Sequence, residues 1–282
     1  MADKYAVIGN PIAHSKSPLI HTLFAQQTGQ DISYEKIEAP LDGFAATVER
    51  LREEGYKGCN VTVPFKLETS EVITDISTEA LDAFHAGHNS DAVNTLIFRD
   101  GKIIGHNTDG IGLVNDIENN LRIPLNGKRI LLIGAGGAAY GVLHPLLEAS
   151  KAPLVIYNRT LEKAISLKKS IERHENFRSF FVNAVEFGTL GDAQFDVVIN
   201  ATSAGLTGSD IPLPSTIFAP GALAYDMMYG RETPFMKFAR EQGAAIVSDG
   251  LGMLVEQAAE AFFIWRGVRP DTAPVLAKLR TP

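Results

Sequence analysis

Short apolar runs alternate with stretches of helical periodicity along the first third of the chain. In order, the pattern predicts a strand at 5–9, a helix at 17–27, a strand at 32–38, a helix at 41–54 and a strand at 58–63. Ser17 is expected to cap the first helix, with Pro18 at its first position, and Gly55 to end the second. This βαβαβ order indicates an α/β fold with a mostly parallel sheet.

A second alternating series follows a less regular segment. That segment contains predicted helices at 67–84 and 110–121, and strands at 92–98 and 102–105 around the hairpin signal Arg99-Asp100-Gly101. Pro124 and Asn126-Gly127 mark a boundary before the alternation resumes. The later elements are predicted as strands at 153–157, 180–182, 195–200, 222–226 and 244–247 and helices at 161–173, 253–265 and 274–279. The chain therefore carries two α/β series.

The second series opens with an apolar strand that ends at glycines. Arg129 to Ile133 runs into Gly134-Ala135-Gly136-Gly137-Ala138-Ala139, and a helix-compatible run at 140–149 follows. The spacing of Gly134, Gly136 and Ala139 matches G-x-G-x-x-G/A, in which the glycines form a tight turn and let a pyrophosphate approach the backbone. Free amides at a helix N-terminus favour phosphate. The pattern predicts a Rossmann-type, doubly wound dinucleotide-binding domain.

The end of the next strand indicates which dinucleotide is bound. NAD-type folds place a carboxylate there to hold the ribose 2′-hydroxyl, but this strand ends at Asn158-Arg159-Thr160. Arg159 suits a 2′-phosphate, and Lys163 adds positive charge one helical turn later. The alternative is that Thr160 only caps a helix and that both cations are solvated. The arrangement favours NADP over NAD.

Composition and charge narrow the class of partners. The chain has 282 residues, enough for two domains, and a net charge of −7, which argues against nucleic acid or an anionic membrane as partner. Its one cysteine, Cys59, excludes an intrachain disulfide. The N-terminus does not resemble a signal peptide, and no apolar stretch has membrane-spanning length. We expect a cytoplasmic protein.

Two polar segments outside the glycine turn are candidates for catalysis. Lys66 follows Asn60-Val61-Thr62-Val63-Pro64-Phe65 at a helix start, where the helix dipole disfavours a cation, and Asp109 follows Asn107-Thr108 before another helix. Reduction of a carbonyl needs a group that transfers the alcohol proton. Taken singly, however, Lys66 could be an exposed lysine, Asp109 a helix cap, and Ser15 and Ser17 capping residues.

Together these segments resemble the shikimate dehydrogenase family over nearly the whole chain. The resemblance is carried by ordered motifs at 9–18, 60–66, 92–95, 107–110, 134–138, 158–160, 200–203, 225–229 and 249–258. It implies NADP-linked interconversion of shikimate and 3-dehydroshikimate in the route to chorismate and the aromatic amino acids. It also implies that Lys66 is the acid-base residue, with Asp109 beside it.

The resemblance further assigns substrate and cofactor contacts. Ser15, Ser17 and Tyr229 would bind the substrate carboxylate, while Asn60, Thr62, Asn94 and Gln257 would bind its ring hydroxyls. The residues expected at the cofactor are Gly134, Ala135, Gly136, Gly137, Ala138, Asn158, Arg159, Thr160, Lys163, Ala201, Thr202, Ser203, Met227 and Gly250. No metal is expected, because the histidines lack metal-ligand spacing.

The same resemblance implies the domain organisation. Residues 1–109, completed by the C-terminal helices at 248–282, would form the substrate domain, and residues 110–247 would form the NADP domain. Two departures from the family pattern stand at 85–92, which replaces a compact loop, and at Tyr140, where relatives often carry arginine. A monomer and a homodimer both remain open.

Two alternatives to this interpretation remain. One is a quinate/shikimate dehydrogenase that uses NAD or both nucleotides, against which Arg159 and the paired Ser15 and Ser17 argue. The other is a non-catalytic nucleotide sensor of the same fold. Such a sensor would have no reason to retain Lys66 and Asp109 together with the substrate serines.

Overall fold

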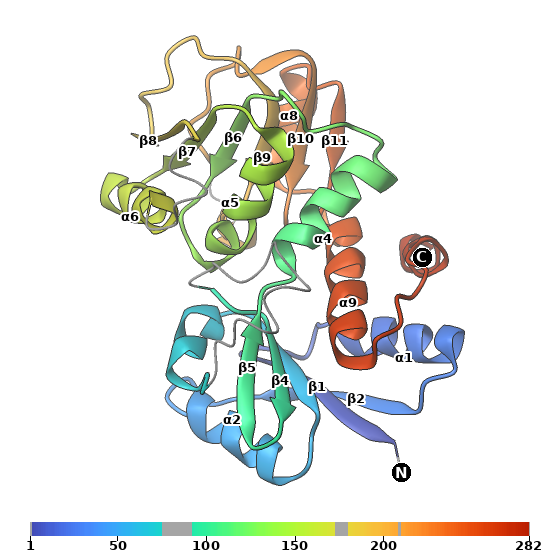
Figure 1. Cartoon of the computed structure of the whole chain (residues 1–282). Coiled ribbons are helices and arrows are strands. Elements are labelled where there is room, and N and C mark those ends of the chain that lie inside the picture. The colour runs from blue at the N-terminus through green and yellow to red at the C-terminus, as the bar shows by residue number, and fades with distance from the viewer. Residues whose placement is uncertain (1, 75–91, 173–179, 208–209, 282) are drawn as a thin grey trace. The chain divides into compact units, whose positions relative to one another are not determined.

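The computed structural model describes residues 2–74, 92–172, 180–207 and 210–281 (Figure 1). Two compact units are present, one made of Met1–Gly112 with Leu254–Pro282 and the other of Leu113–Met253. The second unit is thus an insertion within the first. The atypical segment at 85–91 and most of the predicted helix at 67–84 lie outside the described residues. None of the described helices has the length and apolar character needed to cross a bilayer.

A five-stranded sheet forms the centre of the first unit. Its order is β2-β1-β3-β4-β5, and its strands are β1 (Asp3–Gly9), β2 (Ile32–Glu38), β3 (Gly58–Val61), β4 (Thr95–Arg99) and β5 (Lys102–His106). β1, β2 and β3 pair in parallel, whereas β4 is antiparallel to both β3 and β5. Four of the five strands therefore run in one direction, which confirms the predicted mostly parallel sheet.

Helices cover both faces of this sheet. α2 (Phe44–Glu53) and the 3₁₀ helix η1 (Phe65–Glu71) bury Phe44 and Phe65 against the apolar side chains of one face. On the other side, α1 (Ser17–Thr28) packs with α9 (Leu251–Arg266) and α10 (Ala273–Arg280) around Phe24 and Phe262. The C-terminal helices thus complete the core of the N-terminal unit.

Most predicted elements of this unit are present, with shifted ends. α2 begins at Phe44 rather than at 41, and η1 begins at Phe65 rather than at 67. The predicted hairpin is confirmed, because Asp100 and Gly101 both adopt positive φ between the antiparallel strands β4 and β5. The ends differ because local sequence signals fix a helix boundary only to within a few residues.

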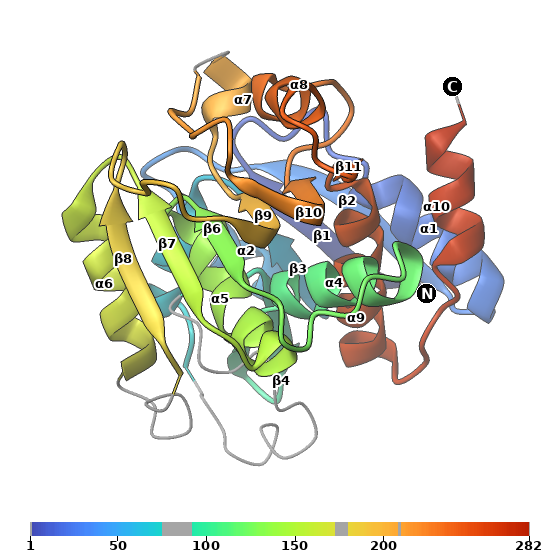
Figure 2. The same cartoon turned by 90° about the horizontal axis from the view of Figure 1, so that it is seen from above.

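The second unit contains a six-stranded, fully parallel sheet (Figure 2). Its strands are β6 (Ile130–Ile133), β7 (Leu154–Asn158), β8 (Val182–Glu186), β9 (Phe195–Asn200), β10 (Phe218–Asp226) and β11 (Ile246–Ser248). The order β8-β7-β6-β9-β10-β11 corresponds to the 3-2-1-4-5-6 order of the Rossmann fold. The direction of winding reverses between β6 and β9, and this is the point where such sheets bind ligands.

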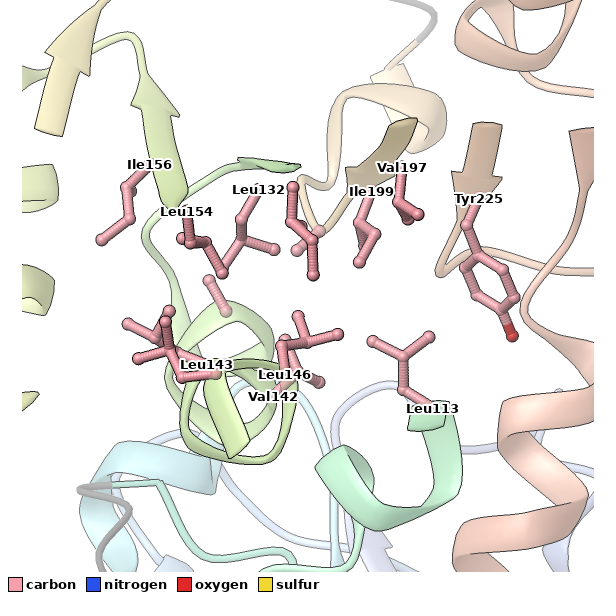
Figure 3. Packing of buried hydrophobic residues seen from close by; sticks show 14 of the residues in the cluster. Leu113, Leu132, Val142, Leu143, Leu146, Leu154, Ile156, Val197, Ile199 and Tyr225 are labelled. Atoms are coloured by element: carbon pink, nitrogen blue, oxygen red, sulfur yellow. The ribbon is translucent and has the colours of Figure 1, made fainter. Parts of the chain in front are cut away.

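Helices again cover both faces of the sheet. α5 (Gly137–Ser150) and α6 (Leu161–Glu172) lie on one face, where Leu143 and Leu146 of α5 point toward strand residues such as Leu132 and Ile156 (Figure 3). α4 (Asp109–Asn115) and the π-helical turn η2 (Asp116–Asn120) add Leu113 to the same core. α8 (Pro234–Glu241), which the hydrophobic pattern did not predict, covers the opposite face (Figure 2).

Candidate active site

Lys66 and Asp109 form an ion pair at the centre of the polar cluster in the first unit. Nζ of Lys66 donates to Oδ2 of Asp109, and the two side chains are only 15% and 7% exposed. Lys66 is the second residue of η1, which follows β3, and Asp109 is the first residue of α4, which follows β5. Both therefore stand just beyond the ends of strands that run in the same direction.

The backbone around Asp109 leaves its carboxylate available. The amide of Asp109 donates to Oδ1 of Asn107 at 2.8 Å. One of the free amides at the start of the helix is thereby satisfied without the Asp109 carboxylate. The carboxylate instead uses Oδ2 for Lys66 and Oδ1 for Nδ2 of Asn94, at 2.9 Å. The capping interpretation of Asp109 is therefore wrong, because Asp109 is the first helical residue and its own amide donates to Asn107.

Gln257 of α9 joins the same cluster from the other end of the sequence. Its Oε1 lies 3.3 Å from Nδ2 of Asn94 and 3.2 Å from the hydroxyl of Thr108. Gly112 makes this approach possible, because a Cβ at that position would lie 2.7 Å from the backbone nitrogen of Gln257. Helices α4 and α9 thus cross closely enough to bring together residues 145 or more positions apart in the chain.

Asn60, at the end of β3, connects this cluster to β2. Its Nδ2 donates to the carbonyl of Asn94 at 3.1 Å and to Oγ1 of Thr95 at 3.0 Å, while its Oδ1 accepts from the hydroxyl of Tyr34 at 2.7 Å. Thr62 is half-buried directly after the strand, and its amide bonds to the carbonyl of Ile8. The structure therefore places Asn60 inside the network and Thr62 beside it in the chain.

Ser15 and Ser17 stand together at the start of α1. Oγ of Ser15 lies 3.2 Å from Oγ of Ser17 and accepts from the Ser17 amide at 3.3 Å. The expectation that Ser17 is the helix cap is wrong, because the capping position is Lys16 and Ser17 is the first helical residue. The hydroxyl of Ser15 thus satisfies the amide of Ser17 at the start of the helix, and the two serine hydroxyls lie next to each other.

The glycine turn of the second unit has the geometry that a dinucleotide site requires. Gly134 adopts φ of 110°, and a Cβ there would lie 3.1 to 3.2 Å from Thr202 and Ala201 at the end of β9. Gly136 precedes the first turn of α5, and a Cβ there would meet no atom within 4 Å. The open space beside Gly136, at the N-terminus of a 14-residue helix, fits a pyrophosphate.

The tip of β7 also fits NADP. Arg159 is exposed and makes no ion pair with a described residue, while the Asn158 side chain bonds to the carbonyl of Thr160 at 2.8 Å. Lys163 is exposed on the first turn of α6. The strand tip thus presents cations and no carboxylate. Tyr140, the departure noted above, directs its hydroxyl at Ser166 of α6 at 3.3 Å.

Buried polar groups hold the loops that follow β9 and β10. Oδ1 of Asn200 accepts from both the amide and the hydroxyl of Thr202, and its Nδ2 bonds to Asp226 at 3.1 Å. Burial raises the pKa of Asp226, against hydrogen bonds from Thr233, Met228 and Asn200. Gly250 packs against the carbonyl of Met227 so closely that any side chain would collide with it.

Other predicted residues of the second unit are positioned as follows. Ser203 is exposed after β9, and Ala201 is buried. Tyr229, after β10, is half-buried, and burial raises the pKa of its hydroxyl. Ala135, Gly137 and Ala138 complete the turn into α5. These residues belong to the 113–253 unit, whereas the ion pair and its network belong to the other.

Models of known families match three parts of the chain. Residues 7–96 match the shikimate dehydrogenase substrate binding domain, residues 117–207 match shikimate / quinate 5-dehydrogenase, and residues 250–280 match the shikimate 5'-dehydrogenase C-terminal domain. The shikimate dehydrogenase (NADP(+)) of Methylobacillus flagellatus is 60% identical over 278 residues, 99% of each chain. The chain belongs to the shikimate dehydrogenase family.

Solved structures are similar to this chain over its full length. An Ael1 enzyme from Pseudomonas putida is 48% identical with a TM-score of 0.88, covering 100% of this chain and 99% of that one. The Thermus thermophilus shikimate 5-dehydrogenase, solved in complex with NADP(H) and shikimate, is 31% identical with a TM-score of 0.82, covering 99% and 98%. The two-domain α/β fold with a Rossmann-type unit is therefore shared with these proteins.

Several residues of the network were not identified from the sequence. Thr95, Asn107 and Thr108 lie within the family motifs, so their position beside Asn94 and Asp109 was a usable signal. Tyr34 had none, because it is one of several alternating residues in an ordinary strand. Its hydroxyl contact with Asn60 depends on the pairing of strands and could be found only in the fold.

Proposed function

We propose that this chain is an NADP-dependent shikimate dehydrogenase that interconverts shikimate and 3-dehydroshikimate in the shikimate pathway. The buried pair of Lys66 and Asp109 is the observation that carries the proposal. Reduction of a carbonyl to an alcohol requires a proton donor at the oxygen, and the reverse reaction requires an acceptor. The two shikimate dehydrogenases named above, 60% and 31% identical, support the same activity.

Lys66 is proposed to exchange the proton with the reacting oxygen. Its ammonium donates to the developing alkoxide when the ketone is reduced, and its neutral amine accepts the hydroxyl proton when the alcohol is oxidised. Asp109 holds the ammonium in place, and Asn94 fixes Asp109 through its other oxygen. When bound, NADPH supplies the hydride to the carbonyl carbon.

The remaining polar groups of the first unit are proposed to bind the substrate. Ser15 and Ser17 present adjacent hydroxyls that suit a carboxylate. Tyr229 is proposed as a further contact of the substrate carboxylate. Asn60, Thr62, Asn94 and Gln257 are proposed to contact the ring hydroxyls. Since buried polar groups left without a partner cost free energy, such a site discriminates against analogues that lack a hydroxyl.

The second unit is proposed to hold NADP. The amides from Gly134 to Ala138 at the start of α5 would bind the pyrophosphate, and Arg159 with Lys163 would bind the 2′-phosphate. The further contacts proposed for the cofactor come from Asn158, Thr160, Ala201, Thr202, Ser203, Met227 and Gly250. Residues 1–109 with 248–282 are accordingly proposed as the substrate domain, and residues 110–247 as the NADP domain.

A four-way assay of shikimate or quinate with NADP or NAD tests the proposal. Turnover is expected with shikimate and NADP, and kcat/KM should be far lower in the other three combinations. Preference for quinate would contradict the proposed substrate, and equal use of NAD would contradict the role of Arg159. Absence of turnover with all four pairs would contradict the proposal that the chain is a dehydrogenase of these substrates.

The cofactor assignment has a separate test in Arg159→Gln. Loss of the charge-assisted bonds to a 2′-phosphate should raise the KM for NADP about tenfold or more and leave the KM for NAD unchanged. Lys169→Gln is the matched control, because Lys169 is an exposed cation farther along α6. Equal effects of the two substitutions would mean that only general charge, and no specific contact, is involved.

The cellular setting is also proposed. We place the enzyme in the cytoplasm, where its lone thiol, Cys59, stays reduced, and fractionation of cells checks this. Sedimentation equilibrium distinguishes a monomer from a homodimer.

A further inference from the structure

Tyr34 of β2 contacts the hydrogen-bond network around Asn60 and Asp109 through its hydroxyl. Its hydroxyl donates to Oδ1 of Asn60 at 2.7 Å, and the ring is half-buried. Burial raises the pKa of this hydroxyl well above its ordinary value, so it keeps its proton and remains a donor. The contact joins the edge strand of the sheet to the cluster around Asp109.

The direction of the Asn60 amide shows that Tyr34 has to be the donor. The carbonyl of Asn94 can only accept, so the group of Asn60 that faces it at 3.1 Å is Nδ2. The second hydrogen on that nitrogen goes to Oγ1 of Thr95 at 3.0 Å. Oδ1 is therefore the atom beside Tyr34, and only a donor satisfies it. Asn60 is 6% exposed, so water is a poor substitute.

A second backbone group fixes the other end of the network. The amide of Thr108 can only donate, and it lies 2.8 Å from Oδ1 of Asn94. Nδ2 of Asn94 is consequently directed at Asp109, while the hydroxyl of Thr95 donates to Oδ1 of Asn94 at 2.9 Å. One series of hydrogen bonds thus runs in a single direction from Tyr34 to the carboxylate of Asp109, through Asn60, Thr95 and Asn94.

Two neighbours hold Tyr34 at the start of this chain. The ring of His21 stacks on the Tyr34 ring with centroids 4.1 Å apart and planes 7° apart. His21 lies one helical turn after Ser17 on the buried face of α1. Ser17 opposes in part the rise of the Tyr34 pKa that burial causes. Tyr34 therefore lies between His21 of α1 and Asn60 of β3.

We propose that Tyr34 is a positioning residue, whose hydroxyl fixes the orientation of the Asn60 amide. The inference rests on the proposed function, since Asn60 and Ser17 are there assigned to substrate.

Steady-state kinetics of Tyr34→Phe tests this role. Without its donor the Asn60 amide can rotate, so the KM for shikimate should rise about tenfold, the scale of one lost buried hydrogen bond. The kcat should change less, by about threefold at most, because Thr108 still fixes Asn94 and Asp109. The KM for NADP should stay unchanged. Tyr56→Phe is the matched control, because its hydroxyl bonds Glu35 in the same unit, outside the network.

A double-mutant cycle with Asn60→Ala separates positioning from general stability. If Tyr34 acts through Asn60, the double variant should show the same KM for shikimate as Asn60→Ala alone. Additive effects, or a KM for Tyr34→Phe within twofold of that for Tyr56→Phe, would overturn the proposal while the wild-type chain still turns over shikimate. If the wild-type chain does not turn over shikimate, the proposed function fails first, and this inference fails with it.

Discussion

Lys66 and Asp109 form an ion pair although 43 positions separate them in the sequence. The two oxygens of Asp109 divide their contacts, Oδ2 to the ammonium of Lys66 and Oδ1 to the amide of Asn94. The amide of Asp109 donates to Oδ1 of Asn107, so the side chain of Asn107 supplies the local contact to the backbone. A carboxylate held at both oxygens keeps the lysine in one position, which is what proton transfer at a defined atom requires.

Lys66→Ala should remove the acid-base step and leave the cofactor unit intact. We expect kcat to fall by about 10² to 10⁴, the usual contribution of a positioned acid-base group, with the affinity for NADP nearly unchanged. Stopped assays for kcat and fluorescence titration for NADP measure the two effects. Lys237→Ala, at an exposed lysine of α8, is the control. Near-normal turnover in Lys66→Ala would remove Lys66 from the mechanism.

Two neighbouring glycines should respond in opposite ways to alanine. Gly136→Ala adds a methyl group to open space at ordinary φ, so the free energy of unfolding should change by less than about 0.5 kcal/mol. The methyl group nevertheless stands where a pyrophosphate approaches, and the KM for NADP should rise about tenfold or more. A KM equal to that of the wild type would place the phosphates elsewhere.

Gly134→Ala should act mainly on the fold. L side chains rarely adopt a φ of 110°, and the added methyl group would lie only 3.1 to 3.2 Å from Thr202 and Ala201. Strain of this kind costs about 1–3 kcal/mol, which thermal unfolding followed by circular dichroism would detect. A melting temperature no lower than that of Gly136→Ala would show that the turn relaxes without strain.

The buried ring of His21 should make the first unit less stable in acid. Burial lowers the pKa of His21 from 6.5 to about 3, although nearby Asn60 favours the charged form slightly. As the pH falls below 6.5 the unfolded chain takes up the proton and the folded chain does not. The contribution of the neutral ring is thus complete above pH 6.5 and is lost from there toward pH 3, by about 1.4 kcal/mol per pH unit.

The fluorescence of Trp265 reports this loss directly. It is the only tryptophan, and its ring lies 5.5 Å from that of His21 in the same unit. Denaturant unfolding at several pH values from 7.5 to 5 should show a steeper decline for the wild type than for His21→Phe. Parallel pH profiles for the two proteins would mean that His21 is protonated in the folded state.

Cys59 should be inert to thiol reagents while the first unit is folded. Its side chain is fully buried in β3, and burial raises the pKa of the thiol far above its ordinary range, so little thiolate forms. A chromogenic disulfide reagent should label the protein quickly only after denaturant is added. Ser70→Cys, at an exposed position of η1, should add one fast-reacting thiol as a positive control. Fast labelling of the native wild type would show that β3 opens.

Local signals predicted much of the second unit correctly. The glycine turn after β6 and the predicted strand at 195–200 lie where the sequence indicated, because apolar runs and turn residues act over short distances. β10 begins four residues earlier than predicted, since a register shift beside Gly221 lets the strand continue past a turn signal. α8 was missed although Thr233 caps it and Pro234 opens it, both of which were readable signals.

The contacts within the candidate site were harder to predict from the sequence than the fold. Lys66 and Asp109 taken singly were compatible with an exposed lysine and a helix cap, because their contact depends on strand pairing across β3, β4 and β5. Only the family motifs indicated that the two residues belong to one site. No motif pointed to Tyr34, whose contact with Asn60 arises only when β2 and β3 flank β1.

The insertion of one unit within the other sets an order of events during protein synthesis. Residues 113–253 are synthesised before 254–282, so the inserted unit can complete its core first. The buried face of α1, with Ile20 and Phe24, must wait for Val255 and Phe262 of α9. The first unit to be translated is therefore the last to close, and a nascent chain that stops near residue 253 would leave this apolar helix face open to aggregation or to chaperones.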